Sequence, residues 1–193
     1  MVTDDMLLRL ESDYSAAAGE RGRAVNQLIE QLAGKPVELQ LQEVNRFYNQ
    51  FQYREDTSQW GQKDYWATPE EFIGTRQGDC EDYVIAKYFT LRKLGVPDER
   101  LYLTYAKHLQ LNVAHMVLSY FPTQSSAPLI LDNYNGEIVE GSKRKDLLPV
   151  YSFNAKSLFL SNASAGLGKS LPTDKIKNSK WQKLLGDMRN NPP

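Results

Sequence analysis

The only cysteine of the chain, Cys80, stands at the start of an apolar segment, directly after Gly78 and Asp79. Asp79 suits the N-cap of a helix, which would make Cys80 the first helical residue. Free backbone N–H groups and the positive end of the helix dipole favour a thiolate there, and a nearby imidazolium lowers the thiol pKa further. We therefore interpret Cys80 as a nucleophile. The alternative is an unreactive buried cysteine, since free cysteines are among the most buried residues of proteins.

A base and a carboxylate follow later in the chain. His115 lies in the segment Val-Ala-His-Met-Val-Leu, which has an alternating strand pattern. A polar ring in the middle of such a strand indicates a specific role or a polar partner. Asp132 ends the run Pro-Leu-Ile-Leu, and the polar loop 122–127 would let the two segments pair as a hairpin, bringing Asp132 beside His115. Taken singly, His115 could be a satisfied core histidine and Asp132 a turn residue. Together with Cys80 they have the residue types of a nucleophile, base and orienting carboxylate.

Two acids, Asp79 and Glu81, flank Cys80. Negative charge beside a thiol disfavours the thiolate, so the pair works against a nucleophile unless something neutralises it. Carboxylate oxygens at this spacing suit a hard cation, and Ca²⁺ takes ligands of this kind. The alternative is that the acids stabilise the helix N-terminus, for which Asp79 and Asp82 have a cap-like spacing. The residues alone leave both interpretations open.

The elements that must position these residues begin with helices. Apolar residues recur at helical spacing over 24–32 and again over 37–51, separated by Gly34 and Pro36. A capping box that starts at Thr68 opens a short helix, which Gly74 could close. The segment from Cys80 to Leu94 is apolar around much of its circumference, which predicts a buried central helix.

A period-two pattern replaces the helical one after this segment. It predicts strands over 101–106, 113–120 and 129–132, with weaker candidates over 150–153 and 157–160. Asn135-Gly136 is a hairpin turn signal before Ile138 and Val139. His108 falls in an expected loop with no visible partner and receives no role. Helices followed by antiparallel strands define an α+β fold, in which a central helix packs on an antiparallel sheet.

Composition restricts the remaining possibilities. The 193 residues suit a single domain, 1–193, with one core, and the net charge of -1 gives no reason to expect a nucleic acid or an anionic membrane as partner. No apolar stretch reaches the roughly 20 residues of a spanning helix, so no direct membrane insertion is expected. The first residues lack the pattern of a secretory signal, and a lone cysteine does not distinguish cytoplasm from periplasm.

Five segments together resemble a known family: residues 64–69, 78–83, 114–118, 131–133 and 149–154. The sequence looks like the bacterial transglutaminase-like cysteine proteinases of the LapG type, which are periplasmic. This resemblance implies a transglutaminase-like, papain-related fold with a Cys80–His115–Asp132 triad, and Ca²⁺ bound through Asp79 and Glu81. It implies a protein substrate, the N-terminal region of a large surface adhesin cut at a small-residue site such as Ala-Ala, whose release promotes biofilm dispersal. It also implies an inhibitory partner, the periplasmic domain of a LapD-type cyclic di-GMP receptor.

Two other functions use the same residues. A transglutaminase with this triad would pass the acyl group to an amine instead of water, and its products would be cross-links or amine adducts rather than two fragments. A non-catalytic binding module could keep the fold, and its Cys80 would not react with thiol reagents.

Overall fold

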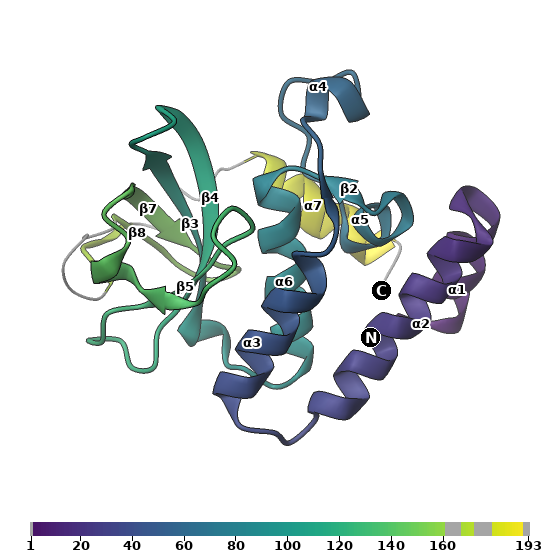
Figure 1. Cartoon of the computed structure of the whole chain (residues 1–193), viewed down its shortest axis with the longest axis horizontal. Coiled ribbons are helices and arrows are strands. Elements are labelled where there is room, and N and C mark those ends of the chain that lie inside the picture. The colour runs from purple at the N-terminus through teal and green to yellow at the C-terminus, as the bar shows by residue number, and fades with distance from the viewer. Residues whose placement is uncertain (1, 161–166, 172–178, 191–193) are drawn as a thin grey trace.

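The computed structural model describes residues 2–160, 167–171 and 179–190. Figure 1 shows α6 between the sheet and the N-terminal helices, with α7 beside it. The helices are α1 (Asp4–Arg9), the π-helix η1 (Leu10–Tyr14), α2 (Ala16–Leu32), α3 (Val37–Tyr48), α4 (Asp56–Gln59), α5 (Pro69–Thr75), α6 (Cys80–Lys93), the 3-10 helices η2 (Asp98–Arg100) and η3 (Gly141–Lys143), and α7 (Ser179–Asn190). No helix in these ranges is long and apolar enough to cross a membrane.

The N-terminal helices pack on one another around a small second core. It consists of Val2, Met6, Leu10, Ala18, Val25, Ile29 and Ile73. The helix α2 begins at Ala16, earlier than the sequence pattern predicts, because Ser15 caps it. The apolar pattern does not show this first part of the helix, because Gly22 packs against Leu10 without an apolar side chain of its own. A Cβ at Gly22 would lie 2.7 Å from Leu10 Cδ1, so these helices approach closely only because that side chain is missing.

The short helix α5 has the predicted capping box between Thr68 and Glu71. Its predicted end at Gly74 is wrong: the helix continues to Thr75 and stops where Arg76 adopts a left-handed conformation with φ 56°. Gly74 serves packing instead, because a Cβ there would lie 2.7 Å from the Tyr14 ring. The segment α5 thereby connects the N-terminal helices to the chain that leads into α6.

The buried helix α6 begins at Cys80, as the sequence predicts, and ends at Lys93, one residue before the predicted Leu94, which is its C-cap. Its buried residues face α3 on one side and the sheet on the other, within a core cluster that includes Tyr48, Tyr83, Leu91, Leu118 and Phe153. Gly95, with φ +92°, turns the chain after the helix, a conformation that favours glycine. The helix is therefore a rigid support for Cys80 at its first position.

The predicted α+β class is confirmed: an antiparallel sheet follows the helices, in the order β6-β5-β4-β3-β7-β8-β9 among the described residues. Its strands are β3 (Leu101–His108), β4 (Val113–Tyr120), β5 (Leu129–Leu131), β6 (Val139–Glu140), β7 (Leu147–Phe153), β8 (Leu158–Leu160) and β9 (Ser170–Leu171). A separate two-stranded parallel pair joins β1 (Gln52–Tyr53) to β2 (Gln77–Gly78). The C-terminal α7, which the pattern did not predict, inserts Trp181 and Leu184 into the main core.

Candidate active site

Cys80 is the first residue of α6 and Asp79 is its N-cap, as the sequence predicts. The Asp82 carboxylate folds back along the turn and accepts hydrogen bonds from the backbone N–H groups of Ala67, at 2.8 Å, and Asp79, at 3.2 Å. Gly78 leaves the space for this, because a Cβ there would lie 2.4 Å from Asp82 Oδ2. Asp82 thus fixes the loop that presents Cys80.

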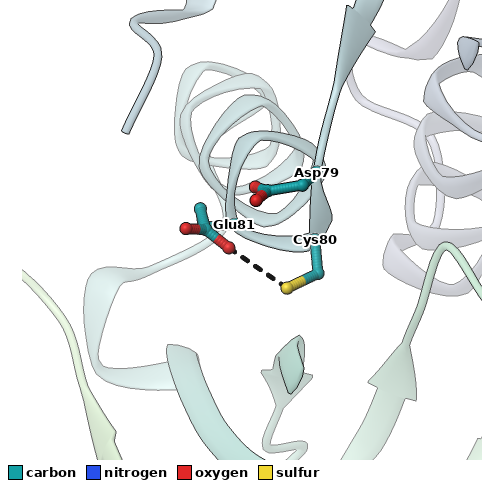
Figure 2. A group of neighbouring side chains, drawn as sticks. All are labelled: Asp79, Cys80 and Glu81. Atoms are coloured by element: carbon teal, nitrogen blue, oxygen red, sulfur yellow. Dashed lines mark hydrogen bonds between the residues drawn. The ribbon is translucent and has the colours of Figure 1, made fainter. Parts of the chain in front are cut away.

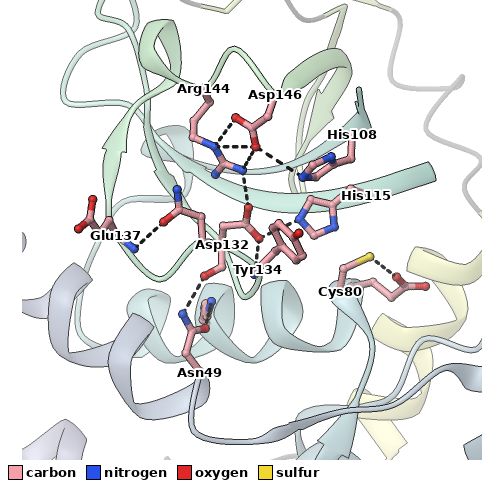
Figure 3. A network of polar contacts seen from close by, with 12 residues as sticks. Asn49, Cys80, His108, His115, Asp132, Tyr134, Glu137, Arg144 and Asp146 are labelled. Atoms are coloured by element: carbon pink, nitrogen blue, oxygen red, sulfur yellow. Dashed lines mark hydrogen bonds and ion pairs between the residues drawn. The ribbon is translucent and has the colours of Figure 1, made fainter. Parts of the chain in front are cut away.

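His115 on β4 and Asp132 directly after β5 are joined by a hydrogen bond of 2.8 Å between His115 Nε2 and Asp132 Oδ1 (Figure 3). Asp132 Oδ1 also accepts the Tyr134 backbone N–H at 2.9 Å, and Oδ2 accepts Arg144 Nη2 at 2.8 Å. Burial alone would raise the pKa of Asp132. The hydrogen bond and charge interaction with His115, together with hydrogen bonds from Tyr134 and Arg144, lower this pKa to about 2. The carboxylate is therefore ionised at neutral pH and able to orient an imidazole.

Cys80 and His115 line the same cleft, which has a volume of about 680 Å³. Met116, the residue after His115, lines this cleft as well. Trp66 and Tyr105 also line this cleft. The structure thus brings together all three residues that the sequence predicts to act jointly.

A second layer of polar residues, which sequence reasoning missed, supports Asp132 from α3 and α6. Asn49 Nδ2 donates to the Asp132 backbone carbonyl at 2.8 Å, and Lys87 Nζ donates to Asn49 Oδ1 at 2.7 Å. Lys87 is fully buried, and burial lowers its pKa to about 7 against the opposing effect of Asp132. A charged residue within the apolar run of α6 is the one sequence signal that could have indicated this support.

The sequence placed His108 in a loop, and this expectation is wrong. The strand β3 extends to His108, and the His108 side chain is buried. Its Nδ1 accepts the Leu111 backbone N–H at 3.3 Å, and its Nε2 lies 3.6 Å from Asp146 Oδ2. The His108 ring contacts the His115 ring edge-on, with centroids 6.0 Å apart. His108 therefore packs directly behind the predicted base. No sequence signal indicated this contact, because His108 extends a strand whose alternating pattern ended two residues earlier.

The electrostatic surroundings of Cys80 are strongly negative. Glu81 Oε2 lies 3.1 Å from the Cys80 sulfur and accepts its hydrogen bond (Figure 2). Burial, followed by the charges of Glu81 and Asp79, raises the pKa of the Cys80 thiol well above its usual value. Burial and the neighbouring acids also raise the pKa of Asp79, to about 10. Burial and the two flanking acids therefore hold Cys80 as a thiol in this arrangement.

The acidic cluster is larger than the sequence predicts, because Asp56 and Asp64 belong to it. Asp56, Asp64 and Glu81 each place a carboxylate oxygen within 4.8 Å of one another, and so do Asp56, Asp79 and Asp82. Asp56 is 3% exposed, and burial raises its pKa to about 6. Asp56 lies near Asp79 because the two-residue strands β1 and β2, which precede these residues, pair in parallel. The sequence did not indicate this pairing, because strands this short have no detectable period.

These residues fit a hard divalent cation. Asp56 Oδ1 and Asp79 Oδ1 are both buried and have no hydrogen-bond partner within the described ranges. Both Asp82 oxygens are occupied by backbone N–H groups, and the Asp64 carboxylate is engaged by Trp66 and Lys180. Asp56, Asp79 and Glu81 remain as the candidate ligands. Buried carboxylate oxygens that lack donors are the ligands Ca²⁺ prefers, and a bound cation would neutralise the charge that they place around Cys80.

A cysteine at a helix start that faces a histidine–aspartate pair on an antiparallel sheet is the site of a thiol-dependent acyl-transfer enzyme. The chain belongs to the bacterial transglutaminase-like cysteine proteinase (BTLCP) family, whose pattern matches residues 19–146. This family membership confirms the predicted resemblance, the transglutaminase-like fold and the predicted class of enzyme, a cysteine protease.

Solved structures of LapG from Legionella pneumophila resemble this chain over nearly its whole length. An EGTA-treated form is 43% identical, with a TM-score of 0.84, and covers 97% of this chain and 98% of that one. A second structure is 43% identical over the same shares, with a TM-score of 0.82. A calcium-bound form is 44% identical, covers 95% of this chain and 98% of that one, and has a TM-score of 0.81. A comparison with curated protein sequences finds no match.

Proposed function

We propose that this cysteine proteinase is a calcium-dependent periplasmic endopeptidase that cuts the N-terminal region of a large surface adhesin at a small-residue, Ala-Ala-like site. Family membership and the near full-length similarity to a LapG protein support this proposal. Cleavage there would release the adhesin from the cell and promote biofilm dispersal. One observation carries the catalytic part: His115, which is hydrogen-bonded to the buried Asp132, lines the same cleft as Cys80.

The proposed mechanism uses these three side chains. The Cys80 sulfur, after giving its proton to His115, attacks the scissile carbonyl carbon and forms a thioester as the peptide C–N bond breaks. His115 returns the proton to the leaving amine and then takes one from the water that hydrolyses the thioester. Asp132 orients the imidazole and stabilises its charged form.

Calcium dependence rests on the acidic cluster and on a relative. Asp56, Asp79 and Glu81 would hold the ion, and Ca²⁺ would neutralise the negative charge that raises the pKa of the Cys80 thiol. One of the similar Legionella structures is a calcium-bound form, and another is EGTA-treated. The alternative of a helix cap accounts for Asp82, whose oxygens accept backbone N–H groups. It leaves Asp56 Oδ1 and Asp79 Oδ1 buried and without a hydrogen-bond partner among the described residues.

We also propose that the periplasmic domain of a LapD-type cyclic di-GMP receptor inhibits this protease by sequestering it. The resemblance of the chain to LapG-type enzymes supports this regulation. Titration of that domain into a cleavage reaction tests the proposal: inhibition at stoichiometric concentration supports it, and undiminished cleavage with excess domain contradicts it.

The experiment that tests the proposed activity incubates the protein with the N-terminal region of the adhesin and a fluorescent primary amine, in calcium or in EGTA. The proposal predicts two fragments in calcium, none in EGTA, and recovery when calcium is restored. Amine-labelled adhesin without fragments would identify a transglutaminase instead. Neither product, together with a Cys80 that iodoacetamide does not modify, would indicate a binding module.

A further inference from the structure

A second pocket lies beyond the predicted catalytic pair and has no part in the mechanism above. It has a volume of about 180 Å³ and is lined from β3, β4, β5, β7 and β8. Thr104, Ala106, Val117 and Ser119 in its wall alternate along β3 and β4 on the same face of the sheet as His115. An apolar protein cavity of about 150 Å³ accommodates a benzene ring, so this pocket has room for a small organic molecule.

The wall of the pocket is mainly apolar. Its apolar lining includes Val117, Phe121, Pro128, Ile130, Leu147 and Phe159. The hydroxyl groups in the wall satisfy one another, because Thr104 Oγ1 lies 2.7 Å from Ser119 Oγ and 2.8 Å from Ser152 Oγ. An occupant therefore needs an apolar body and gains little from these hydroxyls.

Arg144 provides a buried donor in this wall, whereas Lys145, the other cation of the lining, is exposed. Its Nε and Nη2 donate to Asp146, and Nη2 also donates to Asp132, whereas Nη1 is buried and has no partner in the part of the chain that the structure describes. The Arg144 side chain is only 3% exposed. A buried guanidinium N–H without an acceptor costs free energy, which an acceptor in the pocket would recover.

The surrounding charges decide which acceptor fits. Arg144 lies between the carboxylates of Asp132 and Asp146, so these three groups already carry a net negative charge. These two carboxylates oppose a further anion at Arg144, and Lys145, the other cation of the wall, is exposed to solvent. The oxygen of an uncharged carbonyl group would satisfy Nη1 without adding charge.

We propose that this pocket binds a small, uncharged, mainly apolar molecule whose carbonyl oxygen accepts a hydrogen bond from Arg144. The same guanidinium also donates to Asp132, so an occupant of the pocket would be linked through Arg144 to the carboxylate that holds His115. The site is distinct from the cleft that contains Cys80, and its existence does not depend on the substrate or calcium requirement proposed above.

Three probes of similar size test the chemistry: acetophenone, isopropylbenzene and benzoate. Titrations followed by ¹H–¹³C NMR of the intact chain would report on the pocket through the methyl groups of Val117 and Ile130 and on the site through the two histidines. We expect acetophenone to bind about tenfold more tightly than isopropylbenzene, which lacks the acceptor, and at least tenfold more tightly than benzoate. Nuclear Overhauser contacts should join acetophenone to the Val117 and Ile130 methyls, and the His115 resonances should shift.

Two variants locate the effect. Ala106→Leu, which fills the pocket, should weaken acetophenone binding at least tenfold, and Arg144→Lys should remove the preference for acetophenone over isopropylbenzene. Equal affinity of the wild-type protein for these two probes would overturn the role of Arg144, and tighter binding of benzoate would overturn the argument from charge. The absence of contacts to Val117 and Ile130 at saturating acetophenone would overturn the site itself, whether or not the variants fold.

Discussion

His115 Nε2 and Asp132 Oδ1 lie 2.8 Å apart, in a buried pair that commits this imidazole nitrogen to the carboxylate. Nδ1 is therefore the nitrogen left to exchange a proton with Cys80. Arg144 and Asn49 hold the Asp132 side chain and backbone from opposite directions, so the pair cannot rotate without breaking several contacts. Altering Asp132 should therefore affect both catalysis and stability.

Asp132→Asn should lower kcat by a factor on the order of 10²–10⁴ with little change in KM, because a neutral amide stabilises the imidazolium less than a carboxylate does. Steady-state cleavage kinetics would measure this change, and circular dichroism would verify the fold. Unchanged kinetics in a folded variant would reduce Asp132 to a turn residue.

Acid unfolding should also depend on Asp132. Its pKa is lowered from the usual 3.8 to about 2, so the ionised carboxylate contributes stability that is present above about pH 4 and is lost as the pH falls toward 2. We expect the contribution to be about 2 kcal/mol. Urea unfolding between pH 5 and 2 should therefore show a shallower pH dependence for Asp132→Asn than for the wild-type protein, and parallel curves would contradict the assignment.

Lys87 should affect stability in the opposite pH range. Burial lowers its pKa from 10.5 to about 7, so the folded state binds fewer protons than the unfolded state, and stability rises with pH between these values. Replacing Lys87 by Met removes this contribution. Between pH 7 and 9 the wild-type protein should gain about 2 kcal/mol of unfolding free energy relative to Lys87→Met. Lys93→Met, at the exposed end of the same helix, is the control that should follow the wild-type curve.

Asp56→Asn tests the ligand that the sequence did not predict. The variant should bind calcium at least tenfold more weakly, because a buried carboxylate with an unpartnered oxygen is lost from the cluster. The adjacent exposed acid provides the matched control, Glu55→Gln, which should bind calcium as the wild-type protein does. Calorimetric titration would measure both, and equal affinities for all three proteins would remove Asp56 from the set of ligands.

The sequence predicted the central helix, the hairpin strands and the three residues Cys80, His115 and Asp132, because each residue has a local signature: a capped helix start, an alternating strand and a strand end. It could not predict the roles of Asp56, Asn49 or Arg144, because their contacts at the site depend on how the chain folds and have no local pattern in the sequence. The helix α7 was missed because its packing depends on Trp181 entering a core built from other segments. Local patterns therefore identified the reacting groups, whereas the residues that orient them depend on tertiary structure.

The most direct test of the account measures cleavage of the adhesin N-terminal region by Cys80→Ala in calcium. Alanine at a helix start costs little stability, so the fold and the calcium affinity should remain those of the wild-type protein. The account predicts no fragments above background, because no other described side chain in the cleft can serve as a thiol nucleophile. Cleavage by folded Cys80→Ala at a rate near that of the wild-type protein would contradict it.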